Sequence, residues 1–312
     1  MTVVKILRFL MWKFLLLVTV IVGVTTLMFV LTRLSGDAAA LLSPPEASDE
    51  VVEATRVRLG LDQPVLVQYF DAVVGAFTLD FGSSFVTGQA AGALVLERLA
   101  PSLSIVVPGL LLAALLAATI GTYAALHQAD ARGRLLMAGA FVLDGIPYFL
   151  VALVLVLVLA INLRWLPATG GGGSASLVIP IIVLTIQGFA TMSRLTRGQL
   201  IDALSQGPVT MAKAKGLPAR TVLFKHAVPL AVPPLIAYLG ILFSFLIGSL
   251  LILEPLLNYA GIGQLLVRSV NQRDFPAVQA CVFVIAVLIT VVNIVMDVLV
   301  RVLDPRLRTK VA

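Results

Sequence analysis

The sequence predicts an all-α membrane protein with six transmembrane helices. Of its 312 residues, 60% are apolar and 12% are charged, whereas a soluble domain carries about 45–50% apolar and about 25% charged residues. The apolar residues lie in long unbroken runs, and a membrane-spanning helix needs about 20 mostly apolar residues. Strands of a membrane barrel would instead alternate every second residue. A soluble enzyme and a disordered scaffold are therefore excluded.

Six apolar runs have the length of a spanning helix. The first follows Lys5, Arg8 and Lys13 but is longer than the apolar region of a signal peptide, so we expect it to be retained. The fourth is short and contains Pro180 near its start, which suggests a tilted or irregular helix. The runs are Phe14–Leu31, Leu103–Leu126, Leu135–Ile161, Leu177–Met192, Ala231–Leu253 and Ala277–Val300.

The distribution of Lys and Arg predicts the orientation. The two termini and the second and fourth connections carry fifteen of these residues, and the other connections carry seven. Because cytoplasmic connections are enriched in positive charge, we expect both termini in the cytoplasm. The net charge of +6 is explained by attraction to an anionic lipid bilayer, so no nucleic-acid partner is expected.

The connection after the first span is long enough to form an extracytoplasmic insertion. We therefore divide the chain into residues 1–32, the insertion 33–101 and a five-helix core 102–312. Ser48 precedes acidic residues, a helix-start signal, and we expect that helix to end at Gly60 and the next segment to open at Pro64. The insertion holds nine Asp or Glu residues.

The long inner connection, Arg194–Val228, is the first candidate functional segment. Breaks near Gly207-Pro208 and at Gly216-Leu217-Pro218 predict two short helices. The stretch between the breaks is rich in small residues and carries two lysines, which favour exposure to water. Its residues are Thr210, Met211, Ala212, Lys213, Ala214, Lys215 and Gly216. A helix lying on lipid prefers bulky apolar residues opposite its lysines, so we favour a helix that docks in a groove of a partner protein.

This connection resembles the "EAA" loop of ABC importer permeases. The match rests on Ala212-Lys213-Ala214-Lys215-Gly216 and on Pro229, thirteen positions further on. Thr210 and Met211 stand where the family favours Glu and Ala. The resemblance implies a type I importer fold in which the loop at 194–229 holds a coupling helix, seated in a cleft of an ATPase subunit.

Further segments resemble the dipeptide, oligopeptide and nickel class of these permeases, in matching order along the chain. The resemblance implies a bacterial inner-membrane importer with a second homologous permease, two ATPase subunits that use ATP and Mg, and an extracytoplasmic substrate-binding protein. The cargo would be a peptide or a nickel or metal chelate. The segments are Leu34-Ser35-Gly36-Asp37, Leu59-Gly60-Leu61-Asp62-Gln63-Pro64, Asp80-Phe81-Gly82-Ser83-Ser84, Leu166-Pro167-Ala168-Thr169-Gly170, Gly261-Ile262-Gly263, Arg273-Asp274-Phe275-Pro276 and Leu303-Asp304-Pro305-Arg306.

The chain itself has no phosphate-binding Gly-x-x-x-x-Gly-Lys-[Ser/Thr] loop, so it is expected to be no enzyme and to bind no cofactor. His127, His226 and Cys281 are too scattered to predict a metal site. A stand-alone ion-coupled secondary transporter is the alternative function, and it would show inverted repeats and several intramembrane charges. A membrane anchor for a signalling partner would not need Pro-rich spans.

Two carboxylates are candidates for the transport pathway. An ionisable residue at membrane depth is costly and is a functional candidate. Asp144 lies inside the third span, where it either lines the pathway or serves packing. Glu254 lies at the outer end of the fifth span, where it either faces the vestibule below a docked binding protein or lies in the headgroup layer.

Overall fold

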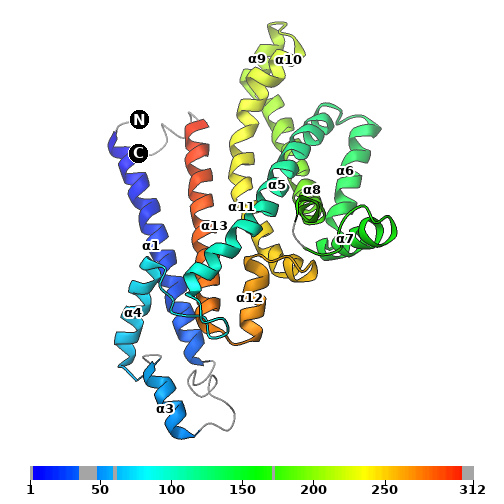
Figure 1. The fold of residues 1–312 in the computed structure, drawn as a ribbon. Helices are drawn as coiled ribbons and strands as arrows, with labels where there is room; N and C mark the ends of the chain where they lie inside the picture. The colour runs from blue at the N-terminus through cyan, green and yellow to red at the C-terminus, as the bar shows by residue number, and fades with distance from the viewer. Residues whose placement is uncertain (1–2, 35–47, 59–61, 171–172, 304–312) are drawn as a thin grey trace. The chain divides into compact units, whose positions relative to one another are not determined.

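The structure is a computed structural model that describes residues 3–34, 48–58, 62–170 and 173–303. Within these ranges the regular elements are helices (Figure 1), and the β-pairing is limited to an isolated bridge between Ser83 and Ala90. Five helices are long and apolar enough to cross a membrane, or six if one bent pair counts as a single span. An all-α membrane fold is therefore confirmed.

The chain divides into two compact units. One comprises residues 7–100 and 265–290, and the other comprises 1–6, 101–264 and 291–312. The helices, in chain order, are α1 (Val3–Leu34), α3 (Asp49–Arg58), α4 (Val65–Thr78), α5 (Ala91–Leu126), α6 (Ala131–Asp144), α7 (Tyr148–Leu155) with the π-helix η1 (Val156–Asn162), the short η2 (Ser174–Leu177), α8 (Val178–Ser205), α9 (Gly207–Ala214), α10 (Ala219–Thr221) with the π-helix η3 (Val222–Ala227), α11 (Val228–Leu256), α12 (Ile262–Asn271) and α13 (Phe275–Leu303).

The unit that holds the insertion has α4 packed against α1. The Tyr69 hydroxyl lies 2.9 Å from the Thr26 hydroxyl, and the Tyr69 and Phe29 rings meet edge to face at 5.5 Å. The helix that we expect after Ser48 is present as α3, and α4 begins directly after Pro64. The predicted stop at Gly60 and the Ser35-Gly36-Asp37 segment lie outside the described residues.

Asp274 ties the segment after α4 to the start of α13 within the same unit. Its buried carboxylate accepts a hydrogen bond from Ser84 Oγ at 2.5 Å and another from the Phe85 amide at 3.0 Å. A buried carboxylate with two donors holds its partners firmly, because losing either donor leaves charge unpaired. The segment around Ser84 is therefore an ordered part of this unit.

The other unit is built around α8, which contacts α6, α7 and α11. The third predicted span, Leu135–Ile161, is formed by a pair of helices that bend by 91°. Helix α6 ends at Asp144 and α7 begins at Tyr148. Pro147 causes the break, because it lacks an amide proton and disfavours helical backbone in the residue before it.

The fourth span differs from its prediction. It is not short, because α8 continues for 28 residues to Ser205 and includes Arg194 and Arg197. Pro180 is accommodated in the first turn, where an amide proton has no helical partner. The predicted first helix of the inner connection is therefore the end of α8, and the segment after Pro218 runs into α11.

Candidate functional site: an exposed helical loop and a cavity between helices

Helix α9 occupies the stretch in which the sequence predicts a docking helix. Pro208 lies in its first turn, and the amides of Val209 and Thr210 both donate to the Gln206 carbonyl at 3.0 Å. Proline fits this position because its missing amide proton would have no helical partner. Figure 1 shows α9 and α10 at one end of the α8–α11 pair, so the loop projects from the bundle.

The end of α9 is a Schellman motif centred on Gly216. The Gly216 amide donates to the Lys213 carbonyl at 2.9 Å, and the Leu217 amide donates to the Ala212 carbonyl at 3.3 Å. Gly216 has a φ of +71°, and no atom lies within 4 Å of the position a Cβ would take. The glycine is therefore required by backbone conformation and not by lack of space.

One face of α9 is anchored in its own unit. Val209 and Ala212 are buried, so Ala212 holds the helix in place and is not free to touch a partner. Burial of these side chains stabilises α9, which has only eight residues and depends on packing for its stability. The apolar cluster around them comprises Ala125, Leu200, Ala203, Val222, Leu223, Ala227 and Ala231.

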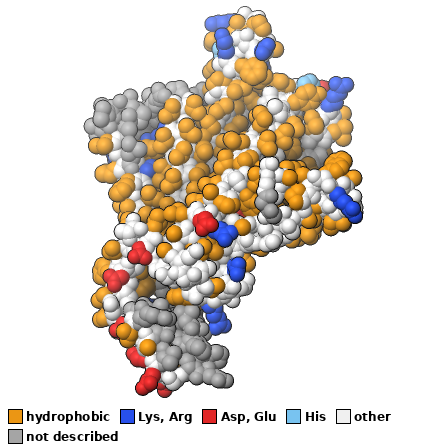
Figure 2. Space-filling model, viewed as in Figure 1, with side chains coloured by type: hydrophobic (Ala, Val, Ile, Leu, Met, Phe, Trp, Pro, Cys, Tyr) orange, Lys and Arg blue, Asp and Glu red, His pale blue; other side chains and the backbone are white. Residues whose placement is uncertain are grey.

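The other face of α9 is open. Met211 is 62% exposed, and Thr210, Lys213, Ala214 and Lys215 are exposed as well. Figure 2 shows Lys and Arg side chains gathered over the tip formed by α9 and α10, whereas hydrophobic side chains cover the flanks of the helices below. The outer face thus offers one flexible apolar side chain between lysines, a surface suited to contact with a protein groove.

The loop returns to the membrane helices without a break. Helix α10 passes into η3 and then into α11, whose first turn contains the exposed Pro229. A π-helix and a proline each weaken the regular hydrogen-bond ladder. Pro233 and Pro234 follow inside α11. The irregular backbone is therefore concentrated between α9 and the membrane-spanning part of α11.

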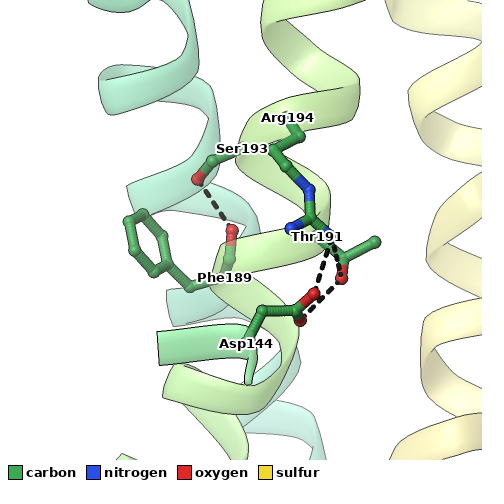
Figure 3. A network of polar contacts seen from close by, with 5 residues as sticks. All are labelled: Asp144, Phe189, Thr191, Ser193 and Arg194. Atoms are coloured by element: carbon green, nitrogen blue, oxygen red, sulfur yellow. Dashed lines mark hydrogen bonds and ion pairs between the residues drawn. The ribbon is translucent and has the colours of Figure 1, made fainter. Parts of the chain in front are cut away.

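Asp144, the first pathway candidate, is held by α8. Its carboxylate receives hydrogen bonds from Arg194 at 2.7 Å and from Thr191 Oγ1 at 2.9 Å, and Arg194 also donates to Thr191 Oγ1 at 3.3 Å (Figure 3). The Asp144 and Arg194 side chains are 32% and 36% exposed. This network joins the end of α6 to α8 at the bend before α7.

A cavity of about 330 Å³ opens beside this network. Asp144, Gln187 and Thr191 line it together with apolar residues of α7, α8 and α11. Sequence reasoning singles out Asp144 but misses Thr191, Arg194 and Tyr238, which also lines the cavity. The three-residue spacing of Thr191 and Arg194, which puts both on one helix face, is the signal that could have identified them.

Glu254, the second pathway candidate, is buried among residues of its own unit, and its place in the pathway stays a prediction. The residue is fully buried and accepts hydrogen bonds from Ser102 Oγ at 2.6 Å and from the amides of Gly263 and Gln264 at 2.8 and 3.1 Å. The Ile262 amide in turn donates to Ser102 Oγ at 2.8 Å. The carboxylate caps the start of α12, where amide protons need acceptors.

The same corner accounts for the Gly261-Ile262-Gly263 segment. A Cβ on Gly261 would lie 2.2 Å from a Glu254 carboxylate oxygen, and one on Gly263 would lie 2.6 Å from the Leu250 carbonyl oxygen. Both glycines therefore permit a close approach of α12 to α11. Among the described residues, no group of three His, Cys, Asp or Glu side chains is placed to hold a metal ion.

Comparison with known proteins shows similarity to transport proteins along most of the chain. Residues 117–309 match the model of the "binding-protein-dependent transport system inner membrane component" family, and residues 6–106 match the model of the N-terminal part of these membrane components. The glutathione transport system permease protein GsiC of Salmonella typhimurium (strain LT2) is 33% identical over 290 residues, which cover 93% of this chain and 94% of that protein. GsiC of Escherichia coli (strain K12) has the same identity and coverage.

A solved structure shares the fold. An inward-facing form of the MetNI methionine ABC transporter superposes with a TM-score of 0.58 at 15% sequence identity. The match covers 68% of this chain and 96% of that one. At this level of identity, the likeness shows the fold alone.

Proposed function

The chain belongs to the family of binding-protein-dependent inner membrane components, the permeases of ABC importers, and on this premise we propose that it carries short peptides across the inner membrane. It is a multi-pass transport subunit of the type I importer fold and not an enzyme. The alternative of an ion-coupled secondary transporter is not retained, because energy in this family comes from ATPase partners.

Two features support a peptide as cargo. The curated relatives, identical at one position in three over 93% of the chain, are named for the transport of glutathione, which is a peptide. The cavity beside Asp144 combines polar acceptors with apolar walls, the usual composition of a small-molecule site. A nickel ion of useful affinity would call for several converging imidazole, thiolate or carboxylate ligands, so a metal chelate is the second candidate cargo.

We propose further that the outer face of α9 docks in a cleft of an ATPase subunit. The exposed, capped helix with an anchored inner face is the observation that carries this assignment. A docking helix must be rigid at its ends and open on one side, since a floppy loop would not transmit displacement. The complete importer would hold two ATPase subunits, a second permease and an extracytoplasmic binding protein, with both termini of this chain on the ATPase side.

Cross-linking tests the docking face directly. Cys281 is the chain's single cysteine, so a Cys281→Ser background accepts one new thiol. A Met211→Cys variant, co-expressed with the partner ATPase subunit into which a cleft cysteine has been introduced, should form an intersubunit disulfide. Leu115→Cys is a matched control, because Leu115 is 61% exposed on α5. Equal cross-linking from both positions would contradict the assignment.

Uptake into proteoliposomes tests the cargo. The complete transporter, loaded with ATP inside and binding protein outside, should accumulate labelled dipeptides or glutathione, and hydrolysis should rise when the binding protein carries peptide. A nickel chelate taken up in preference to every peptide would replace the peptide assignment and leave the permease assignment intact.

A further inference from the structure

The cavity at the α6–α7 bend has the size and composition of a ligand site inside the membrane helices. Its volume is about 330 Å³, within the range of pockets that enclose small molecules, about 300–1,000 Å³. Its walls include Val151, Val183, Ile241 and Phe245 from three different helices. An apolar enclosure of this kind lowers the local dielectric and strengthens any polar contact made inside it.

The polar groups that line the cavity include a carboxylate, an amide and several hydroxyls, but no cation. Asp144 contributes the carboxylate, and Thr191, Tyr148 and Tyr238 contribute hydroxyls, while no Lys, Arg or His lies among the described lining residues. Gln187 donates from Nε2 to Ser249 Oγ at 2.8 Å, but its Oε1 is buried and has no hydrogen-bond partner in the described part of the chain. A buried acceptor without a donor is costly unless a ligand supplies one.

The charge balance limits how strongly a cation would bind here. Arg194 does not line the cavity, yet it neutralises Asp144 across a 2.7 Å contact. A ligand therefore meets a carboxylate that already has one cationic partner, together with two neutral oxygens.

From these observations we infer that the cavity is a transient subsite for the N-terminal ammonium group of a short peptide, bound by Gln187 Oε1, Thr191 and Asp144. The inference rests on the proposed peptide cargo and deepens it. An ammonium group has three donors and no acceptor, which suits the unpartnered Gln187 Oε1 together with the remaining lone pairs of the Asp144 carboxylate. The apolar walls hold the adjoining side chain, and the partly neutralised carboxylate keeps affinity low enough for release towards the cytoplasm.

Saturation-transfer NMR on the complete transporter in nanodiscs, without binding protein, tests the subsite because it detects weak ligands. The probes are alanyl-alanine and N-acetyl-alanyl-alanine, which differ in the ammonium group. We expect saturable transfer to the free dipeptide in the millimolar range and at least a severalfold smaller effect for the acetylated one. Loss of a hydrogen bond to a charged group should weaken binding about tenfold or more in Gln187→Met.

Matched variants separate a subsite from a packing role. Gln279→Met makes the same exchange in α13 at a residue that does not line this cavity, and should bind the free dipeptide as the parent does. Asp144→Asn/Arg194→Gln removes both charges without leaving one unpaired, and should bind both probes equally poorly. Each variant is used only after it assembles with its partners and hydrolyses ATP on addition of loaded binding protein.

The outcomes are distinguishable from failure of the proposed function. Uptake of dipeptides together with equal saturation transfer to both probes, or with undiminished transfer in Gln187→Met, overturns the subsite and leaves peptide import standing. If neither probe shows saturation transfer, the subsite is overturned as well. Selective binding of the free dipeptide without any uptake would retain the subsite and refute peptide import.

Discussion

Replacing Gly216 by valine should uncouple the transporter without unfolding it. Gly216 has a φ of +71° and open space around its Cβ position, so the cost of a side chain is conformational. An L-residue in the left-handed region costs about 1–2 kcal/mol, and a β-branched residue is among the least tolerant there. The valine backbone is expected to leave that region and to break the amide contacts to Lys213 and Ala212.

The magnitude follows from that cost. About 1.4 kcal/mol corresponds to a factor of ten in an equilibrium constant, so the ratio of correctly ended to wrongly ended α9 should fall roughly tenfold. Val209 and Ala212 remain buried in the apolar cluster, and the spanning helices are untouched. Membrane insertion and assembly should therefore persist while the outer face of α9 is misplaced.

The assay compares ATP hydrolysis stimulated by loaded binding protein with peptide uptake in the same proteoliposomes. Gly216→Asn should retain much of both activities, because asparagine tolerates left-handed backbone. Gly198→Val is the matched control, since Gly198 lies in α8 with nothing within 4 Å of its Cβ position. Normal stimulation and uptake in Gly216→Val would refute the reasoning, as would equal losses in Gly198→Val.

Three further predictions follow from described contacts. Ser102→Ala removes hydrogen bonds to Glu254 and from Ile262 and should destabilise the protein by about 1–3 kcal/mol; thermal unfolding measures it, with the exposed Ser205→Ala as control, and an unchanged midpoint would count against the capped corner. Asp144→Asn and Arg194→Gln should each lower the melting temperature more than the double variant does, because a single change leaves one charge unpaired; additive losses in a double-mutant cycle would contradict the pair's coupling. In the assembled complex, the segment around Ser84 should resist protease, and Asp274→Ala should expose it by removing the acceptor for Ser84 and Phe85, whereas the exposed Asp202→Ala should not; a parent protein already cleaved there would refute an ordered segment.

Helix number and the place of the docking helix could be predicted because both depend on local signals. Apolar runs of spanning length, the break at Gly207-Pro208 and the glycine after Lys215 each act within a few residues. The apolar run at 135–161 predicts a span but not the direction of its helices, because Pro147 alone does not determine whether a helix kinks slightly or turns by 91°. The fourth span is predicted to end at Met192 because the apolar run stops before Arg194, although the helix itself continues to Ser205.

The carboxylates show where sequence reasoning stops. Position along an apolar run predicts depth in the membrane, but it does not predict which side chain from a distant segment will meet a carboxylate. Glu254 and Ser102 are 152 positions apart, and Asp144 and Arg194 are 50 apart. Pairing at such separations is decided by packing, and packing is visible only in three dimensions.

The buried corner at Glu254 also imposes an order on biogenesis. Ser102 enters the membrane early, whereas Glu254 and the amides of Gly263 and Gln264 emerge from the ribosome much later and within a few residues of one another. A nascent chain that stops before α12 would present a buried carboxylate with two donors missing, which is costly in a hydrocarbon environment. Completion of the first turn of α12 supplies both amide donors, so the corner closes only in chains that already include this helix.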